Sequence, residues 1–90
     1  MPQAIADSEE LRRFAQNLKR FNDSLQQQMG VLYAQLSNLG ATWRDQEHKK
    51  FMEEFEQTML AIKRFVQATE RHIPFLLRKA ERIDEYLQQR

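Results

Sequence analysis

The stretch that decides the fold is Leu39-Gly40-Ala41-Thr42-Trp43-Arg44-Asp45, which contains one of only two glycines and the single tryptophan. A long helical pattern lies on each side of it. Gly40 is well suited to the left-handed conformation that often ends a helix. Thr42, with Asp45 three positions later, is a capping pattern for the start of the next helix. Because only residues 40–42 are left as a turn, the sequence predicts an all-α, antiparallel two-helix hairpin in a single domain, residues 1–90.

The first helix is expected over about residues 8–39. Asp7 and Glu10 form a capping-box pattern at its start. Gly30 costs about 1 kcal/mol relative to Ala inside a helix, so it marks either close packing or a weak point. Apolar residues recur every three or four positions with one stutter, as on the buried side of a helix. The stripe is Leu11, Phe14, Leu18, Phe21, Leu25, Met29, Leu32, Leu36 and Leu39.

The second helix is expected over about residues 43–73, with a stripe that starts at Phe51 and Phe55 and includes Phe65. Pro74 deletes an amide and presses on the preceding turn, which predicts a kink or break near residues 69–73. At 1.5 Å per residue the two helices are then about equally long, roughly 46–48 Å. Residues 74–90 are therefore predicted to overhang the hairpin as a helical extension.

A second apolar column on the second helix predicts self-association. Its members are seven residues apart, and they widen the apolar face to about 120°, which is more than one partner helix covers. A chain of 90 residues also has a small core and often needs a partner for stability. We expect a homodimer that forms a four-helix bundle. The residues assigned to the dimer interface are Met52, Met59, Val66 and Ile73.

Charge and composition exclude several classes of function. The 14 basic and 13 acidic side chains are interspersed and leave a formal net charge of +1, which does not indicate nucleic-acid binding. Both predicted helices have faces of mixed sign, unlike a membrane-surface helix. No apolar run is long enough for a signal peptide or a membrane span, so we expect a cytoplasmic protein without membrane insertion.

No catalytic, cofactor or metal site is expected. The absence of cysteine excludes thiolate chemistry, and two glycines cannot build a phosphate-binding loop. Asp45 and His48 have the acid-x-x-His spacing of carboxylate-bridged metal bundles. The apolar stripe of the first helix has no acidic residue to complete such a ligand set. The protein is therefore predicted not to be an enzyme.

Partner contacts are predicted at the two ends of the hairpin. Trp43 lies at the tip, where two helices offer little core to cover a large ring. The segment after Pro74 has apolar side chains without an intrachain helix to bury them. The predicted partner-binding residues are Trp43, Asp45, Phe75, Leu76, Leu77, Ile83, Tyr86 and Leu87.

Together, the chain length, the two long antiparallel helices and the tryptophan at the start of the second helix resemble the WXG family, the early-secreted-antigen-like small proteins of type VII secretion. The resemblance covers nearly the whole chain. The family motif Trp-x-Gly reads Trp43-Arg44-Asp45 here, so the tryptophan matches and the glycine does not. The family's export tag is Tyr-x-x-x-Asp/Glu, whereas Tyr86 is followed four residues later by Arg90.

The resemblance implies a four-helix-bundle dimer without enzymatic activity, exported without a cleaved signal peptide. It implies a role as secreted effector, partner chaperone or targeting module. Its partners are then a second copy or a sister hairpin, and a secretion motor or cargo protein. The alternative is a cytoplasmic structural adaptor, a coiled-coil component of a larger assembly that is not exported.

Overall fold

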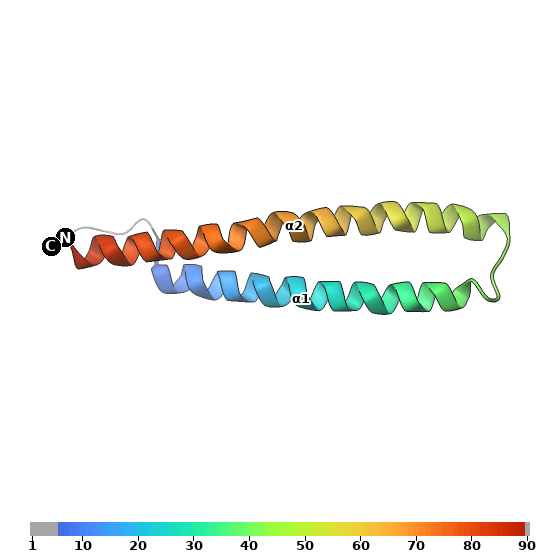
Figure 1. Ribbon diagram of the computed structural model, residues 1–90, viewed down its shortest axis with the longest axis horizontal. Helices are drawn as coiled ribbons and strands as arrows, with labels where there is room; N and C mark the ends of the chain where they lie inside the picture. The colour runs from blue at the N-terminus through green and yellow to red at the C-terminus, as the bar shows by residue number, and fades with distance from the viewer. Residues whose placement is uncertain (1–5, 90) are drawn as a thin grey trace.

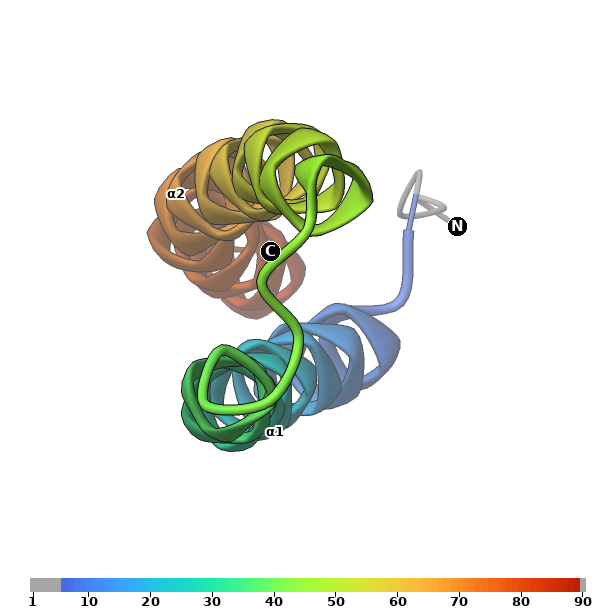
Figure 2. The ribbon, with the colours of Figure 1, turned by 90° about the vertical axis from the view of Figure 1, so that its right-hand side faces the viewer.

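The computed structural model describes residues 6–89, which form two antiparallel helices (Figure 1). Helix α1 spans Ser8–Leu39 and α2 spans Gln46–Gln88. The rod they form measures 70 × 17 × 15 Å, and the end-on view shows the loop that joins the two helices (Figure 2). The predicted all-α hairpin is confirmed. Residues 1–5, where no signal peptide is expected, and Arg90, four positions after Tyr86, lie outside the described residues.

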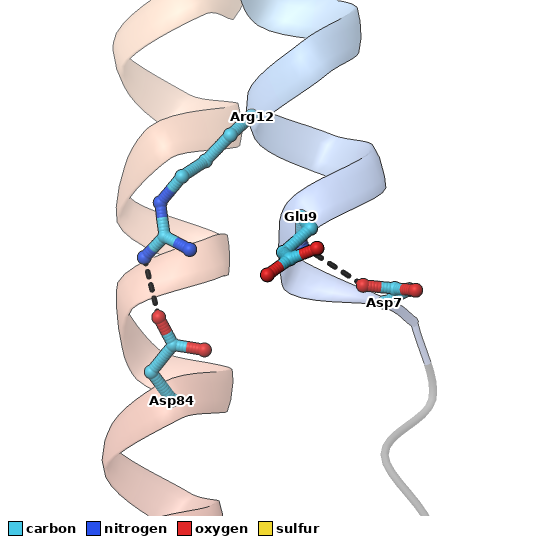
Figure 3. A network of polar contacts seen from close by, with 4 residues as sticks. All are labelled: Asp7, Glu9, Arg12 and Asp84. Carbon is cyan, nitrogen blue, oxygen red and sulfur yellow. Dashed lines mark hydrogen bonds and ion pairs between the residues drawn. The ribbon is translucent and has the colours of Figure 1, made fainter.

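Helix α1 begins as its sequence predicts but ends differently. The carboxylate of Asp7 accepts a hydrogen bond of 2.9 Å from the amide of Glu9 (Figure 3), which satisfies one free donor of the first turn. At the other end Gly40 has φ −63° and ψ −16°, a right-handed conformation. The left-handed conformation predicted for Gly40 is therefore wrong, and its amide donates to the carbonyl of Leu36, at 3.2 Å.

Helix α2 begins three residues later than predicted, at Gln46. The amides of Thr42 and Trp43 both donate to the carbonyl of Leu39, at 3.1 and 2.8 Å, so residues 40–43 keep winding at the end of α1. The N-cap of α2 is Asp45, whose carboxylate accepts from the amide of His48 at 3.0 Å. The predicted cap at Thr42 is wrong, and Trp43 lies in the connection rather than in the helix.

Helix α2 continues through Pro74 without interruption. Of the kink or break predicted near residues 69–73, the break is therefore wrong. The overhang is shorter than predicted and does not begin at Pro74, because the start of α1 lies beside α2 as far as Asp84. Ala80 and Ile83 are buried, and Asp84 forms an ion pair with Arg12. α2 extends past α1 at both ends (Figure 1), since side-chain packing, rather than equal helix length, sets how the helices align.

The intrachain core is a narrow seam. Buried residues of α1 are spaced by seven, and α2 supplies a facing set that includes Met59 and Val66, which are only 2% and 4% exposed. The assignment of Met59 and Val66 to a dimer interface is thus corrected, because packing against α1 already buries both side chains. Met52 and Ile73 of that column are half-buried. The seam consists of Ser8, Ala15, Asn22, Met29 and Leu36 with Met59, Val66, Thr69, Ala80 and Ile83.

A polar pair inside the seam fixes the alignment of the helices. The Nδ2 of Asn22 donates to the Oγ1 of Thr69 at 2.8 Å, and this hydroxyl donates to the carbonyls of Phe65 and Val66, at 3.1 and 3.0 Å. Both side chains are buried. Because a buried amide without a partner is costly, other alignments of the two helices are disfavoured.

Replacing Thr69→Val should lower the free energy of unfolding by about 1–3 kcal/mol, because the buried amide of Asn22 loses its acceptor. Urea unfolding at one fixed protein concentration measures this difference. Thr58→Val is the matched control: its hydroxyl also donates to a backbone carbonyl, that of Glu54 at 3.1 Å, but it is exposed. Equal effects of the two substitutions would show that the interhelical bond does not stabilise the hairpin.

Candidate functional site

The two edges along which α1 and α2 meet differ in chemistry. On one edge the rings of Phe21 and Phe65, each one position before a seam residue, meet edge to face with centroids 6.1 Å apart. On the other edge Gln26 donates to Glu70 at 3.3 Å, and the Nζ of Lys63 lies 5.8 Å from the ring centroid of Tyr33. One long side of the hairpin is therefore apolar and the opposite side is polar.

The apolar side retains large exposed side chains. The seam is built partly from small or polar residues such as Ala15, Asn22 and Thr69, so bulkier side chains of the predicted stripes lie beside it. Phe14 and Phe21 are more than half exposed. Large exposed apolar side chains gathered along one side of a protein are typical of a protein contact. We call it the apolar face, and it comprises Phe14, Phe21, Leu32, Leu39, Phe51 and Phe65.

Sequence reasoning did not identify the apolar face, because it placed the phenylalanines toward the partner helix. The buried residues are distinguished from the exposed phenylalanines by a strict seven-residue spacing, in Ala15, Asn22, Met29 and Leu36. A search for large apolar side chains overlooks Ala15 and Asn22.

Neither helix, over the described residues, has a stretch long and apolar enough to cross a bilayer.

At the tip, the half-buried Trp43 packs against its own chain. Its ring centroid lies 5.0 Å from that of His48 and 5.7 Å from that of Phe51. The contacts continue along the hairpin, since Phe51 stacks on Phe55 at 5.7 Å and Phe55 meets Tyr33 edge to face at 6.2 Å. This aromatic ladder anchors the connecting loop and leaves part of the tryptophan surface accessible.

Asp45 and His48 have structural roles at the tip. The carboxylate of Asp45 caps α2, and His48 packs between Trp43 and Gly40, with its Cε1 4.0 Å from where a Cβ on Gly40 would lie. The Nε2 of His48 is buried and has no hydrogen-bond partner among the described residues. Across residues 6–89, no three His, Asp or Glu side chains gather as metal ligands would.

The predicted partner-binding residues after Pro74 differ in how far their side chains are exposed. Ile83 is buried in the seam, so its assignment to a partner contact is wrong: α1 already covers it. Leu76 is half-buried. Four residues remain exposed, and Phe75, at 61%, is the most exposed large apolar side chain of the described residues. The exposed set is Phe75, Leu77, Tyr86 and Leu87.

An ion pair holds the open end of the hairpin together. The guanidinium of Arg12 donates to the carboxylate of Asp84 (Figure 3). Hydrogen bonds from Ser8 and from Arg12 hold the pKa of Asp84 below its ordinary value. The sequence alone could not reveal this pair, because its members are 72 positions apart and meet only in the observed alignment.

Asp84 gives the hairpin an acid-sensitive contact. Because the pKa of Asp84 is lower in the folded chain, its contribution is present above the unfolded-state pKa and is lost as the pH falls through the folded-state value. Asp84→Asn should lower the midpoint of thermal unfolding at neutral pH and should lose less stability than the wild type on acidification. Thermal melts at several pH values, followed by circular dichroism, measure this. Glu85→Gln, an exposed neighbour, is the control, and an identical acid response of Asp84→Asn and wild type would contradict the assignment.

Comparison with known proteins gives two matches to the whole architecture. The model of the WXG100 family, described as proteins of 100 residues with WXG, matches residues 3–86. The crystal structure of a secreted protein ESXB from Bacillus anthracis str. Sterne is similar with a TM-score of 0.77 and 27% sequence identity. The match covers 96% of this chain and 98% of that one. Comparison with curated protein sequences gives no match.

Proposed function

The chain belongs to the WXG100 family, and on that basis we propose that it is a non-enzymatic protein-protein interaction module of type VII secretion. The observation that carries the proposal is the apolar face, which a single hairpin leaves exposed along its length. The similarity to a secreted protein over nearly the full chain supports the same function. The hairpin acts by binding other proteins through its long sides and its two ends.

The first partner we propose is a second copy of the chain. Two hairpins that bury their apolar faces against each other form a four-helix bundle with an isologous interface. The half-buried Met52 and Ile73 remain in this proposed interface, whereas Phe21 and Phe65 replace Met59 and Val66 at its centre. A sister hairpin with a similar face is the alternative occupant.

Phe65→Glu should convert the dimer to a monomer, because a buried carboxylate without a partner opposes association. Analytical ultracentrifugation gives the mass, and circular dichroism shows whether the helices persist. Leu60→Glu is the control on the same helix, since Leu60 and Phe65 are similarly exposed, at 43% and 46%, but Leu60 lies outside the apolar face. If wild type is a monomer at micromolar concentration, the dimer proposal fails.

The second partner we propose is the export machinery, which contacts the tip and the C-terminal end. Trp43 keeps part of its ring accessible at the tip, and Tyr86 and Leu87 are exposed near the end of α2. A kink at Pro74, which deletes one helical hydrogen bond, would help to orient this end. The alternative function, a cytoplasmic adaptor without export, uses the apolar face but neither end.

A secretion assay distinguishes the export function from the adaptor function. In the producing cell, a tagged wild-type chain should appear in the medium, and Trp43→Ala and Tyr86→Ala should each reduce secretion while leaving the helical content intact. Point substitutions are preferable to truncation after Ile73, which would also remove Ala80 and Ile83 from the seam. Leu60→Ala is the control for loss of an exposed apolar side chain. Normal secretion of both variants would refute the role of the two ends, and retention of wild type would favour the adaptor.

A further inference from the structure

The side of α2 that faces away from α1 has a row of exposed residues with a charge pattern. Steps of three and four residues along the helix connect Glu47, Lys50 and Glu54 near the tip with Arg71, Phe75 and Arg78 near the open end, all of them exposed. We call this line, from residue 47 to residue 78, the outer row. Its members lie two or five positions after members of the seven-residue column such as Val66 and Ile73, about 200° or 140° around the helix.

Among the residues that the structure describes, the charged groups of the outer row form no ion pair. Across residues 6–89 the ion pair present is that of Arg12 with Asp84, at the edge of the seam. Phe75, the most exposed large apolar side chain described, lies among the arginines. Beside Phe75, a hollow of about 230 Å³ is lined by Arg78, Lys79 and Arg82. The hollow is thus apolar on one side and positively charged on the others, which suits a carboxylate on a short aliphatic stem.

The outer row is complementary to itself when it runs in the opposite direction. An antiparallel copy related by a two-fold axis between residues 62 and 63 sets Glu54 opposite Arg71. The same axis sets Glu47 opposite Arg78, at the hollow beside Phe75. Lys50, the one basic residue in the acidic half of the row, then lies opposite the Phe75 ring, a cation-π arrangement. Symmetry makes each contact twice, and Arg64, the remaining charged member of the row, lies opposite Ala61.

We propose that the outer row is a second self-association surface, where α2 of one hairpin pairs antiparallel with α2 of another copy. Because the charges of the row are complementary to those of an antiparallel copy, the partner we infer is a second copy of this chain and not an unrelated acidic protein. The contact lies on the side of α2 away from the seam, so it can form while the apolar face is occupied. Exposed ion pairs are individually weak and are screened by salt, so the contact should be reversible and sensitive to salt.

Sedimentation equilibrium of the full chain at low and high salt tests this proposal. At about 0.01 M salt, where the Debye length is about 30 Å, the mass should be at least twice that measured at about 1 M salt, where the Debye length is about 3 Å, because each hairpin dimer presents two outer rows. The apolar face keeps its contact at high salt, so the high-salt mass reports the proposed dimer separately. Loss of that dimer leaves this salt-dependent doubling in place, which makes failures of the two proposals distinguishable.

Charge reversal tests the pairing itself. The variant with Glu47→Arg and Glu54→Arg, and the variant with Arg71→Glu and Arg78→Glu, should each lose the low-salt doubling. An equal mixture of the two variants should regain it, because every opposing pair is then of opposite charge. Arg13→Glu with Arg20→Glu on α1 is the matched control and should leave the doubling unchanged.

Three outcomes would overturn the proposal: no change of wild-type mass with salt, doubling that survives either reversal, or a mixture that fails to associate. Binding of wild type to vesicles that contain about one-third phosphatidylglycerol, without any self-association, would assign the row to anionic lipid instead.

Discussion

Packing in this hairpin depends on the seven-residue spacing of small and polar residues along α1. Ala15 and Asn22 occupy seam positions where larger side chains would be expected, and Thr69 of α2 contacts Asn22. Because these residues fill little space, the phenylalanines and leucines beside them lie at the edge of the seam and stay about half exposed. The same spacing that closes one hairpin therefore leaves an apolar face accessible.

The polar pair of Asn22 and Thr69 gives this seam its alignment. Leucine and methionine contacts tolerate a shift of one heptad, but a buried amide must find its acceptor. With that alignment fixed, Arg12 and Asp84 come together at the open end and the aromatic ladder of Trp43 forms at the tip. The observed extension of α2 past both ends of α1 follows from the alignment and not from the lengths of the helices.

Several features of the fold could be predicted from the sequence. Periodicity gave two helices, and the short connection made them antiparallel. The start of α2 was ambiguous because Thr42 and Asp45 are both good N-caps, and the hydrogen bonds of Leu39 decide between them. The buried side was misassigned because the phenylalanine stripe and the seam column are neighbours on the helix surface. The break at Pro74 was over-predicted, since packing of Ala80 and Ile83 against α1 supports the helix after the proline.

This WXG100 family member has several surfaces that differ in chemistry. The apolar face, the polar edge with Gln26 and Glu70, and the outer row lie on separate sides of the same rod. A long two-helix rod has a large surface for its mass, so one short chain can present different chemistry to different neighbours.

The tip has a practical consequence for any study of this protein. Trp43 is the only tryptophan, and from the connecting loop its ring contacts His48 and Phe51 at the start of α2 rather than the seam. Its fluorescence therefore reports the state of the loop, while circular dichroism reports the helices. If the two signals change together on heating, the loop and the helices melt as one cooperative unit, and if fluorescence changes first, the tip opens on an otherwise folded hairpin.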